Sequence, residues 1–144
     1  MMAIRIHPLR LSDYDAMIEL FRICGLDPRT RGRDAKAAIA RQLRSNRAKY
    51  LGAFEGTRLV GTVLGTHDTR KGWINRLAVH PACRRRGLAS RLVRACEQAL
   101  RREGIEMFAA LIETDNDSSK AVFETLGYEI LPMIYARRKA RGNV

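Results

Sequence analysis

The stretch Leu77-Ala-Val-His-Pro-Ala-Cys-Arg-Arg-Arg-Gly-Leu-Ala-Ser90 decides the fold of this chain. Its first residues are apolar and predict a strand that ends before Pro81, and its last residues begin a helix. Gly87 lies between the two elements, and because it has no Cβ the backbone can come close to a ligand. Backbone N–H groups at a helix N-terminus bind phosphate or pyrophosphate, and the three arginines add positive charge there. The stretch therefore predicts a site for a polyanionic ligand.

Size and composition indicate one globular domain spanning residues 1–144. A chain of 144 residues is long enough to bury an apolar core without disulfides or metal. It is 46% hydrophobic and 29% charged, as in ordinary soluble proteins, and has no apolar run long enough to cross a bilayer. Its first residues lack the apolar stretch of a signal peptide. Three cysteines without metal-type spacing favour a cytoplasmic protein with neither disulfide nor metal site.

The formal net charge of +12 favours anionic partners, such as a nucleotide-like cofactor, RNA or an acidic protein surface. An arginine-rich genome accounts for the excess equally well. The positive charges are spread along the chain, without the interleaved aromatic residues of many RNA-binding surfaces. Nucleic acid is therefore the less favoured partner, although it stays open.

Apolar periodicity predicts alternating helices and strands, which is typical of an α/β fold with a mixed sheet. We expect strands over residues 3–7, 50–54, 59–64, 73–79, 107–112, 128–131 and 134–137. Helices are expected after Ser12, after Asp34, over 87–102 and from Asn116 or Asp117, with Ser12 and Asp34 as N-caps. Gly61 and Gly65 inside a strand suggest a bend or a close backbone approach.

Two motifs in this order resemble the GNAT superfamily of acetyl-CoA-dependent N-acetyltransferases, and in particular its short bacterial members. Arg84-x-x-Gly87-x-Ala89 is similar to the acyl-CoA signature of the superfamily and follows Leu-Ala-Val-His-Pro. The second block is Asn116-x-x-Ser119 followed by Phe123-Glu-Thr-Leu-Gly-Tyr128. The resemblance covers essentially the whole chain. It implies an α/β GNAT fold: a mixed, mostly antiparallel sheet of six to seven strands, with splayed fourth and fifth strands and helices on both faces.

The resemblance also implies acetyl-CoA as acyl donor, with no metal. The positions that match the cofactor contacts of the family are Leu77, Ala78, Val79, Arg84, Arg85, Arg86, Gly87, Leu88, Ala89, Ser90, Asn116 and Phe123. The strand residues would offer main-chain groups to pantetheine, and the loop would hold the pyrophosphate. Other roles stay open: Asn116 also suits a helix N-cap, Phe123 a core position, and each arginine side chain either a phosphate contact or solvent.

For catalysis, the resemblance implies that an amine attacks the acetyl thioester directly while the N–H of Val79 polarises its carbonyl. The chain departs from the family in two places. Phe123 stands where many members have a tyrosine acid, and Asn75, with its neighbours Ile74 and Arg76, stands where many have a glutamate base. Water-mediated proton removal is one substitute for the missing side chains.

Two side chains are candidates for the missing acid and base. Glu113 follows the expected fifth strand and either faces the cleft or is a solvated strand end. Tyr128 is a candidate proton donor, although the family usually has a packing aromatic there. The candidate catalytic residues are therefore Val79, Glu113 and Tyr128.

The acceptor is expected to be a small-molecule or protein amine. In this family the loop between the first two helices contributes to acceptor choice, and here Arg29, Arg31 and Arg33 in that loop either bind an acidic acceptor or are solvated. The main hypothesis is an N-acetyltransferase. The alternatives are a non-catalytic acyl-CoA-binding or regulatory module and an RNA-associated or protein N-terminal acetyltransferase. We expect no membrane partner, and a homodimer stays open.

Overall fold

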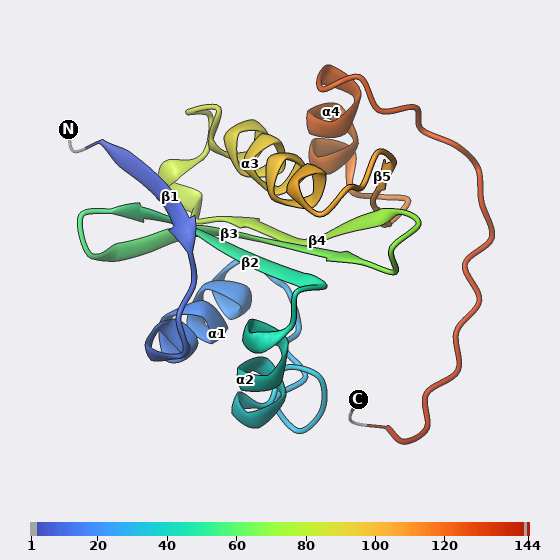
Figure 1. Ribbon diagram of the computed structural model, residues 1–144. Helices are drawn as coiled ribbons and strands as arrows, with labels where there is room; N and C mark the ends of the chain where they lie inside the picture. Colours follow the sequence, from blue (N-terminus) through green and yellow to red (C-terminus); the bar gives the residue numbers. More distant parts are fainter. Residues whose placement is uncertain (1–2, 143) are drawn as a thin grey trace.

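A five-stranded sheet lies at the centre of the computed structural model, which describes residues 3–142 and 144 (Figure 1). The strands follow one another across the sheet in sequence order, antiparallel except for the last pair, β4 and β5. Their bounds are β1 Ile4–Pro8, β2 Ala48–Glu55, β3 Arg58–His67, β4 Gly72–Val79 and β5 Phe108–Ala109. The hairpin expected at Gly56 joins β2 to β3.

Helices cover both faces of the sheet (Figure 1). On one face lie α1 and α2, and on the other lie α3 and α4. Their bounds are α1 Tyr14–Ile23, α2 Lys36–Arg44, α3 Leu88–Arg102 and α4 Asp117–Thr125, with short 3-10 turns η1 Leu11–Asp13 and η2 Pro81–Cys83. No described helix is both long and apolar enough to cross a membrane. The mixed α/β architecture expected from the sequence is confirmed.

Two apolar clusters fill the spaces between the sheet and its helices. One lies under α3 and α4, where Leu92, Val93 and Leu100 are fully buried. The other lies under α1 and α2, around Phe21 and Ile39. The strand β3 supplies both clusters, because it is central and buried on both faces. The apolar run at 107–112 predicted a central strand of this kind, but β5 lies at the edge of the sheet.

Gly65 marks the place where α3 lies against β3. A Cβ added at this glycine would lie 2.6 Å from the Sγ of Cys96 and 3.3 Å from the Cδ1 of Leu100. At Gly61 it would lie 2.9 Å from the Cδ1 of Leu92. The close approach expected from the two strand glycines is therefore confirmed, and the helix that follows Gly87 is held tightly on the sheet.

Substituting Gly65→Ala should lower the free energy of unfolding by about 1–3 kcal/mol, because the new methyl group overpacks the contact with Cys96 and Leu100. Gly142→Ala is the control, since a Cβ there would meet no atom within 4 Å, and it should change stability by less than about 0.5 kcal/mol. Urea denaturation of both variants measures the difference. Equal stabilities would contradict the tight contact.

The described chain has fewer strands than the six to seven expected. Residues 107–112 form a strand only at Phe108–Ala109, and residues 128–131 and 134–137 form none. A strand requires a hydrogen-bonded neighbour, but this C-terminal segment runs away from β5 (Figure 1). Pro132 also lacks an N–H for strand pairing.

Two expected N-caps also differ. Ser12 lies within η1, where the Asp13 carboxylate accepts a hydrogen bond from the backbone N–H of Arg10 at 2.9 Å. The N-cap of α1 is Asp13, whose side chain makes no capping hydrogen bond to that helix. The N-cap of α2 is Ala35 rather than Asp34, because the Asp34 carboxylate binds elsewhere.

Candidate functional site

The strands β4 and β5 separate soon after they begin. Only Gly72 with Phe108 and Trp73 with Ala109 are paired, in parallel register. From there β4 continues to Val79 without a strand on that side, while the chain after β5 continues as irregular structure. The splayed fourth and fifth strands expected from the sequence are thus present.

The main-chain N–H and C=O of Val79 face the side of β4 that this separation opens. The N–H of His80 donates to the carbonyl of Val60 at 2.8 Å, so these residues form a hydrogen-bonded pair of the antiparallel ladder. Along such a ladder, residues that bond the neighbouring strand alternate with residues whose main-chain groups point to the other side. The N–H and C=O of Val79 therefore point away from β3. In agreement, its carbonyl accepts bonds from the Sγ of Cys24 at 3.4 Å and the Nε of Arg84 at 3.2 Å.

The turn between η2 and α3 contains two residues with positive φ. Arg85 has a φ of 64° and Gly87 a φ of 71°, so left-handed residues alternate with residues of negative φ. Such alternation turns successive N–H groups toward one point. The first helical bond of α3 is donated by Arg91, to Gly87 at 3.2 Å, and no side chain caps the helix within the described chain. The N–H groups of residues 88–90 are therefore available to a ligand.

The three arginine side chains of this turn lie in different directions. Arg84 reaches back to the Val79 carbonyl, as described above. Arg86 forms an ion pair with Glu55 at 3.2 Å, next to the β2–β3 hairpin. Arg85 is exposed to solvent. The guanidinium groups of Arg84 and Arg86 therefore contact other parts of the protein, and that of Arg85 is exposed.

Asn116 caps α4. Its Oδ1 accepts hydrogen bonds from the N–H of Ser119 at 3.1 Å and from the hydroxyl of Ser118 at 3.3 Å. The capping role left open by the sequence is therefore present, while the side-chain NH2 group keeps its donors. Phe123, about two turns further on, is 3% exposed and packs edge-on against Tyr128, with the ring centroids 4.9 Å apart. Its position is in the apolar core.

Glu113 and Tyr128 lie in contrasting surroundings. Glu113 is exposed, in the turn that leads from β5 to α4, and its carbonyl accepts the N–H of Asn116 at 3.0 Å. Tyr128 is half-buried, and its hydroxyl donates to Glu97 on α3. Burial, followed by the bond to Glu97, raises the pKa of Tyr128. The phenol thus holds its proton more tightly than in water.

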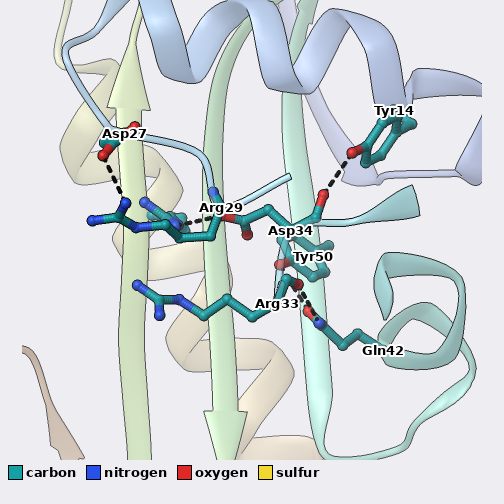
Figure 2. A network of polar contacts seen from close by, with 8 residues as sticks. Tyr14, Asp27, Arg29, Arg33, Asp34, Gln42 and Tyr50 are labelled. Atoms are coloured by element: carbon teal, nitrogen blue, oxygen red, sulfur yellow. Dashed lines mark hydrogen bonds and ion pairs between the residues drawn. The ribbon is translucent and has the colours of Figure 1, made fainter. Parts of the chain in front are cut away.

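A buried ion pair joins the loop before α2 to the middle of β4 (Figure 2). The Asp34 carboxylate, 3% exposed, contacts the Nη2 of Arg76 at 2.7 Å and accepts the N–H of Arg29 at 2.7 Å. The Tyr14 hydroxyl donates to the Asp34 carbonyl at 2.6 Å. Arg76 has a φ of 52° at the point where the β3–β4 register shifts. The ion pair therefore attaches the loop before α2 to β4, at the point where the pairing of β4 with β3 is irregular.

A second set of contacts holds the same loop from α2. The Nε2 of Gln42 donates to the carbonyl of Arg33 at 2.8 Å, and its Oε1 accepts the Tyr50 hydroxyl at 3.0 Å (Figure 2). Burial is the largest cause of the raised pKa of Tyr50, so this phenol is neutral at physiological pH. The loop is thus attached to the protein through both its main chain and Asp34.

Positive charge gathers on the outer side of this loop. Figure 2 shows Arg29 and Arg33 extending from it in the same direction. Lys139, from the C-terminal segment, has a pKa lowered first by the charge of Arg29, with Arg33 and Arg137 adding to the effect. Asp27, in an ion pair with Arg29 at 3.1 Å, is the nearby carboxylate. The loop therefore presents a cationic surface.

The sequence profile of the Acetyltransferase (GNAT) family matches residues 14–128 of this chain. The chain belongs to the GNAT family. Acetyltransferase ECA0875 of Pectobacterium atrosepticum is 32% identical to it over 133 residues, which cover 92% of each protein.

Solved GNAT structures share the fold at lower identity. PaiA N-acetyltransferase from Thermoplasma acidophilum, in complex with coenzyme A, has a TM-score of 0.82 at 19% identity and covers 92% of this chain and 94% of its own. AAC(6')-Iy, in complex with a bisubstrate analogue, has a TM-score of 0.80 at 18% identity. The match covers 96% of this chain and 99% of AAC(6')-Iy. Both proteins show the fold that this GNAT chain adopts.

In this GNAT chain, the expected cofactor residues lie on two segments, the strand–turn–helix at 77–90 and α4 with its N-cap. The main chain of residues 77–79 and the turn at 84–90 are continuous in sequence. Val79 and Phe123 contribute to the same apolar cluster, to which Tyr128 also adds. No contact links the exposed Glu113 side chain to that cluster within the described chain. Among the described residues, no group of three acidic, histidine or cysteine side chains is arranged to hold a metal ion.

Sequence reasoning missed the ion pair of Asp34 and Arg76. Asp34 was interpreted as a helix cap, and Arg76 only as a neighbour of the position where a base is usual. One signal was present: an arginine in the middle of an apolar strand must have a partner, because an unpaired charge is costly to bury. The sequence does not show which of the fifteen acidic residues that partner is.

Proposed function

We propose that this GNAT protein transfers an acetyl group from acetyl-CoA to a primary amine, by direct attack within a ternary complex. The observation that carries the proposal is the pairing of two main-chain features: the outward-facing peptide of Val79 and the uncapped N-terminus of α3 beyond Gly87. The first suits the acyl end of the donor and the second its pyrophosphate. Eight residues of chain separate them.

The proposed cofactor contacts are mostly main-chain groups. Leu77 and Val79 would bind the pantetheine arm along the free side of β4, with Ala78 between them turning its main-chain groups to β3, and Gly87, Leu88, Ala89 and Ser90 would bind the pyrophosphate. Arg85 is the exposed candidate for the 3′-phosphate, whereas Arg84 and Arg86 already contact Val79 and Glu55. Asn116 would donate its amide N–H, and Phe123 would pack beside the thiol end.

In the proposed reaction, the neutral amine nitrogen attacks the thioester carbonyl carbon. A C–N bond forms, the C–S bond breaks, and the N–H of Val79 stabilises the negative charge that develops on the oxygen. The proton lost by the amine passes to water, with Glu113 as the exposed carboxylate able to receive it. The departing thiolate of coenzyme A takes a proton from water or from Tyr128. The raised pKa of Tyr128 supports water as the main donor.

The acceptor we propose carries a carboxylate or phosphate besides its amine. Arg29, Arg33 and Lys139 form a cationic surface beside the loop that contacts β4 through Asp34. Guanidinium groups bind carboxylate and phosphate in bidentate fashion. A polycationic amine would be repelled by this surface. The three free cysteines support a reducing compartment such as the cytoplasm.

The test is a thiol-release assay in which paired amines are supplied with acetyl-CoA. Each pair consists of an amine bearing a carboxylate or phosphate and its uncharged counterpart. Faster release with the acidic member supports the proposed acceptor class, and equal rates contradict it. The alternative is a non-catalytic acyl-CoA-binding module, favoured by the buried Phe123 at the usual tyrosine position. Tight binding of acetyl-CoA with no turnover of any amine would support that module instead.

Asn116→Ser separates cofactor binding from helix capping. Serine retains an acceptor for the N–H of Ser119, so stability should change by less than about 0.5 kcal/mol. It loses the amide donor, and the affinity for acetyl-CoA should fall about 5- to 10-fold, as expected for one lost hydrogen bond. Calorimetry gives the affinity and thermal denaturation the stability. Unchanged affinity would leave Asn116 as a cap alone.

A further inference from the structure

Basic side chains gather where the C-terminal segment meets the loop before α2 (Figure 1). The Nη2 of Arg141 donates to the carbonyl of Arg31 at 2.8 Å, and this bond joins residues 110 positions apart. The charge of Arg29 is the first cause of the lowered pKa of Lys139, so these two cations also lie close together. The side chains that we call the basic cluster are Arg29, Arg31, Arg33, Arg137, Arg138, Lys139 and Arg141.

Little negative charge compensates the basic cluster. Residues 27–33 and 137–141 carry seven basic side chains and one acidic side chain, so their excess of six positive charges is half of the formal net charge of +12. Within the described chain, Asp27 is the one carboxylate in an ion pair with the cluster, at 3.1 Å from the Nη1 of Arg29. Arginines of both segments are exposed to solvent. Because like charges repel, such a cluster favours a partner with many negative charges.

The excess charge is larger than the proposed reaction needs. The acid group of a small acceptor is held by one or two guanidinium groups, which leaves most of the basic cluster without a role in acetyl transfer. An arginine-rich genome also fails to explain it, because a compositional bias raises positive charge along the whole chain. The fold instead brings two basic segments together at one place. This local concentration points to a polyanion.

Exposed aromatic and apolar side chains continue the cluster along the C-terminal segment. Tyr135 is 64% exposed and lies two residues before Arg137, which is about 7 Å of extended chain. Met133 and Ile134, next to it, are exposed as well. Aromatic rings stack on unpaired bases, whereas the faces of bases inside a duplex are covered by their neighbours. The combination of cations with an exposed ring therefore fits a single strand.

We propose that the basic cluster and Tyr135 bind single-stranded nucleic acid, with the arginines on successive phosphates and the tyrosine ring stacked on a base. Six of the seven cations are arginines, which suits this role because the planar guanidinium group binds phosphate in bidentate fashion and also stacks on aromatic faces. The strand would cross from the C-terminal segment to the loop before α2. This binding goes beyond acetyl transfer and requires no acyl donor.

Fluorescence anisotropy with labelled oligouridine tests the proposal without acetyl-CoA or amine, so its outcome is independent of the proposed reaction. For a single strand, each phosphate contact adds about 0.7 to the slope of log affinity against log salt concentration. Arg137→Gln with Arg138→Gln removes two contacts and should lower that slope by about 1.4. The matched control is Arg94→Gln with Arg102→Gln, two exposed arginines of α3, which should keep the slope of the wild type. No binding near physiological salt, or equal slopes in the two double variants, would overturn the proposal.

Tyr135 distinguishes a nucleic acid from an acidic protein as the partner. Tyr135→Ala should weaken oligouridine binding about 5- to 100-fold through the loss of one stacked base, and Tyr135→Phe should bind like the wild type. Polyglutamate, which carries charges but no bases, should compete weakly. Equal affinities of the two Tyr135 variants, with oligouridine displaced by polyglutamate, would assign the cluster to an acidic protein surface and overturn the proposal. Oligothymidine of the same length shows whether the strand is RNA or DNA, and tighter binding of either supports the proposal.

Discussion

Replacing Gly87 with glutamate should weaken acetyl-CoA binding by at least about 100-fold, equivalent to about 2.7 kcal/mol. Two physical effects combine. The carboxylate would stand at the N-terminus of α3, where our proposed site holds the negative pyrophosphate, and like charges a few ångströms apart repel strongly. In addition, Gly87 has a φ of 71°, which a residue with a Cβ adopts only with strain, so the turn itself would shift. Isothermal titration calorimetry measures the loss.

Gly104→Glu provides a closely matched control at the other end of the same helix. Gly104 has a φ of 84°, and a Cβ added at either glycine would meet no atom within 4 Å. Both variants therefore carry the same backbone strain and the same added charge, but only one lies at the proposed phosphate site. Equal affinities of the two variants for acetyl-CoA would refute that site. Loss of affinity in Gly87→Glu alone would localise the pyrophosphate.

The local elements of this site could be predicted from the sequence because short-range chemistry determines them. The strand–turn–helix at Leu77–Ser90 follows from an apolar run, a proline and a glycine within fourteen residues. The N-cap at Asn116 likewise depends on contacts three residues away. Such features are set by neighbouring residues and are largely independent of the rest of the fold.

The features that could not be predicted depend on contacts between distant segments. Asp34 and Arg76 are 42 residues apart, and only the folded sheet places them 2.7 Å from each other. The C-terminal strands failed for a related reason. Residues 134–137 were predicted to form a strand from their composition, but a strand also requires an adjacent strand edge. The chain after Tyr128 runs away from β5, so the edge of that strand is not reached. Composition indicates a preference for strand, whereas topology decides whether it is satisfied.

Arg76→Met should lower the free energy of unfolding by about 3–5 kcal/mol, because it leaves the buried Asp34 carboxylate without its counter-ion. Asp34 would keep only the N–H of Arg29, and the stacking of the guanidinium group over Phe21, at 5.2 Å, would also be lost. For a chain of this size the midpoint of thermal unfolding should fall by about 10–20 °C. Differential scanning calorimetry checks the shift.

The control is Arg29→Met, which removes an ion pair from the same network but at the surface. The Arg29 and Asp27 side chains are 32% and 75% exposed, so solvent screens the pair and its loss should cost less than about 1 kcal/mol. A similar small loss in both variants would show that water already solvates the Asp34–Arg76 pair.

The double variant Asp34→Asn with Arg76→Met distinguishes an unpaired charge from lost packing. Removing both charges should restore more than half of the stability lost in Arg76→Met, because no uncompensated carboxylate stays buried. No recovery would mean that the aliphatic and stacking contacts of Arg76 carry the effect. Since this pair attaches the loop carrying Arg29 and Arg33 to β4, a recovered double variant that still fails to discriminate acidic from neutral amines would assign the pair to acceptor positioning rather than to stability.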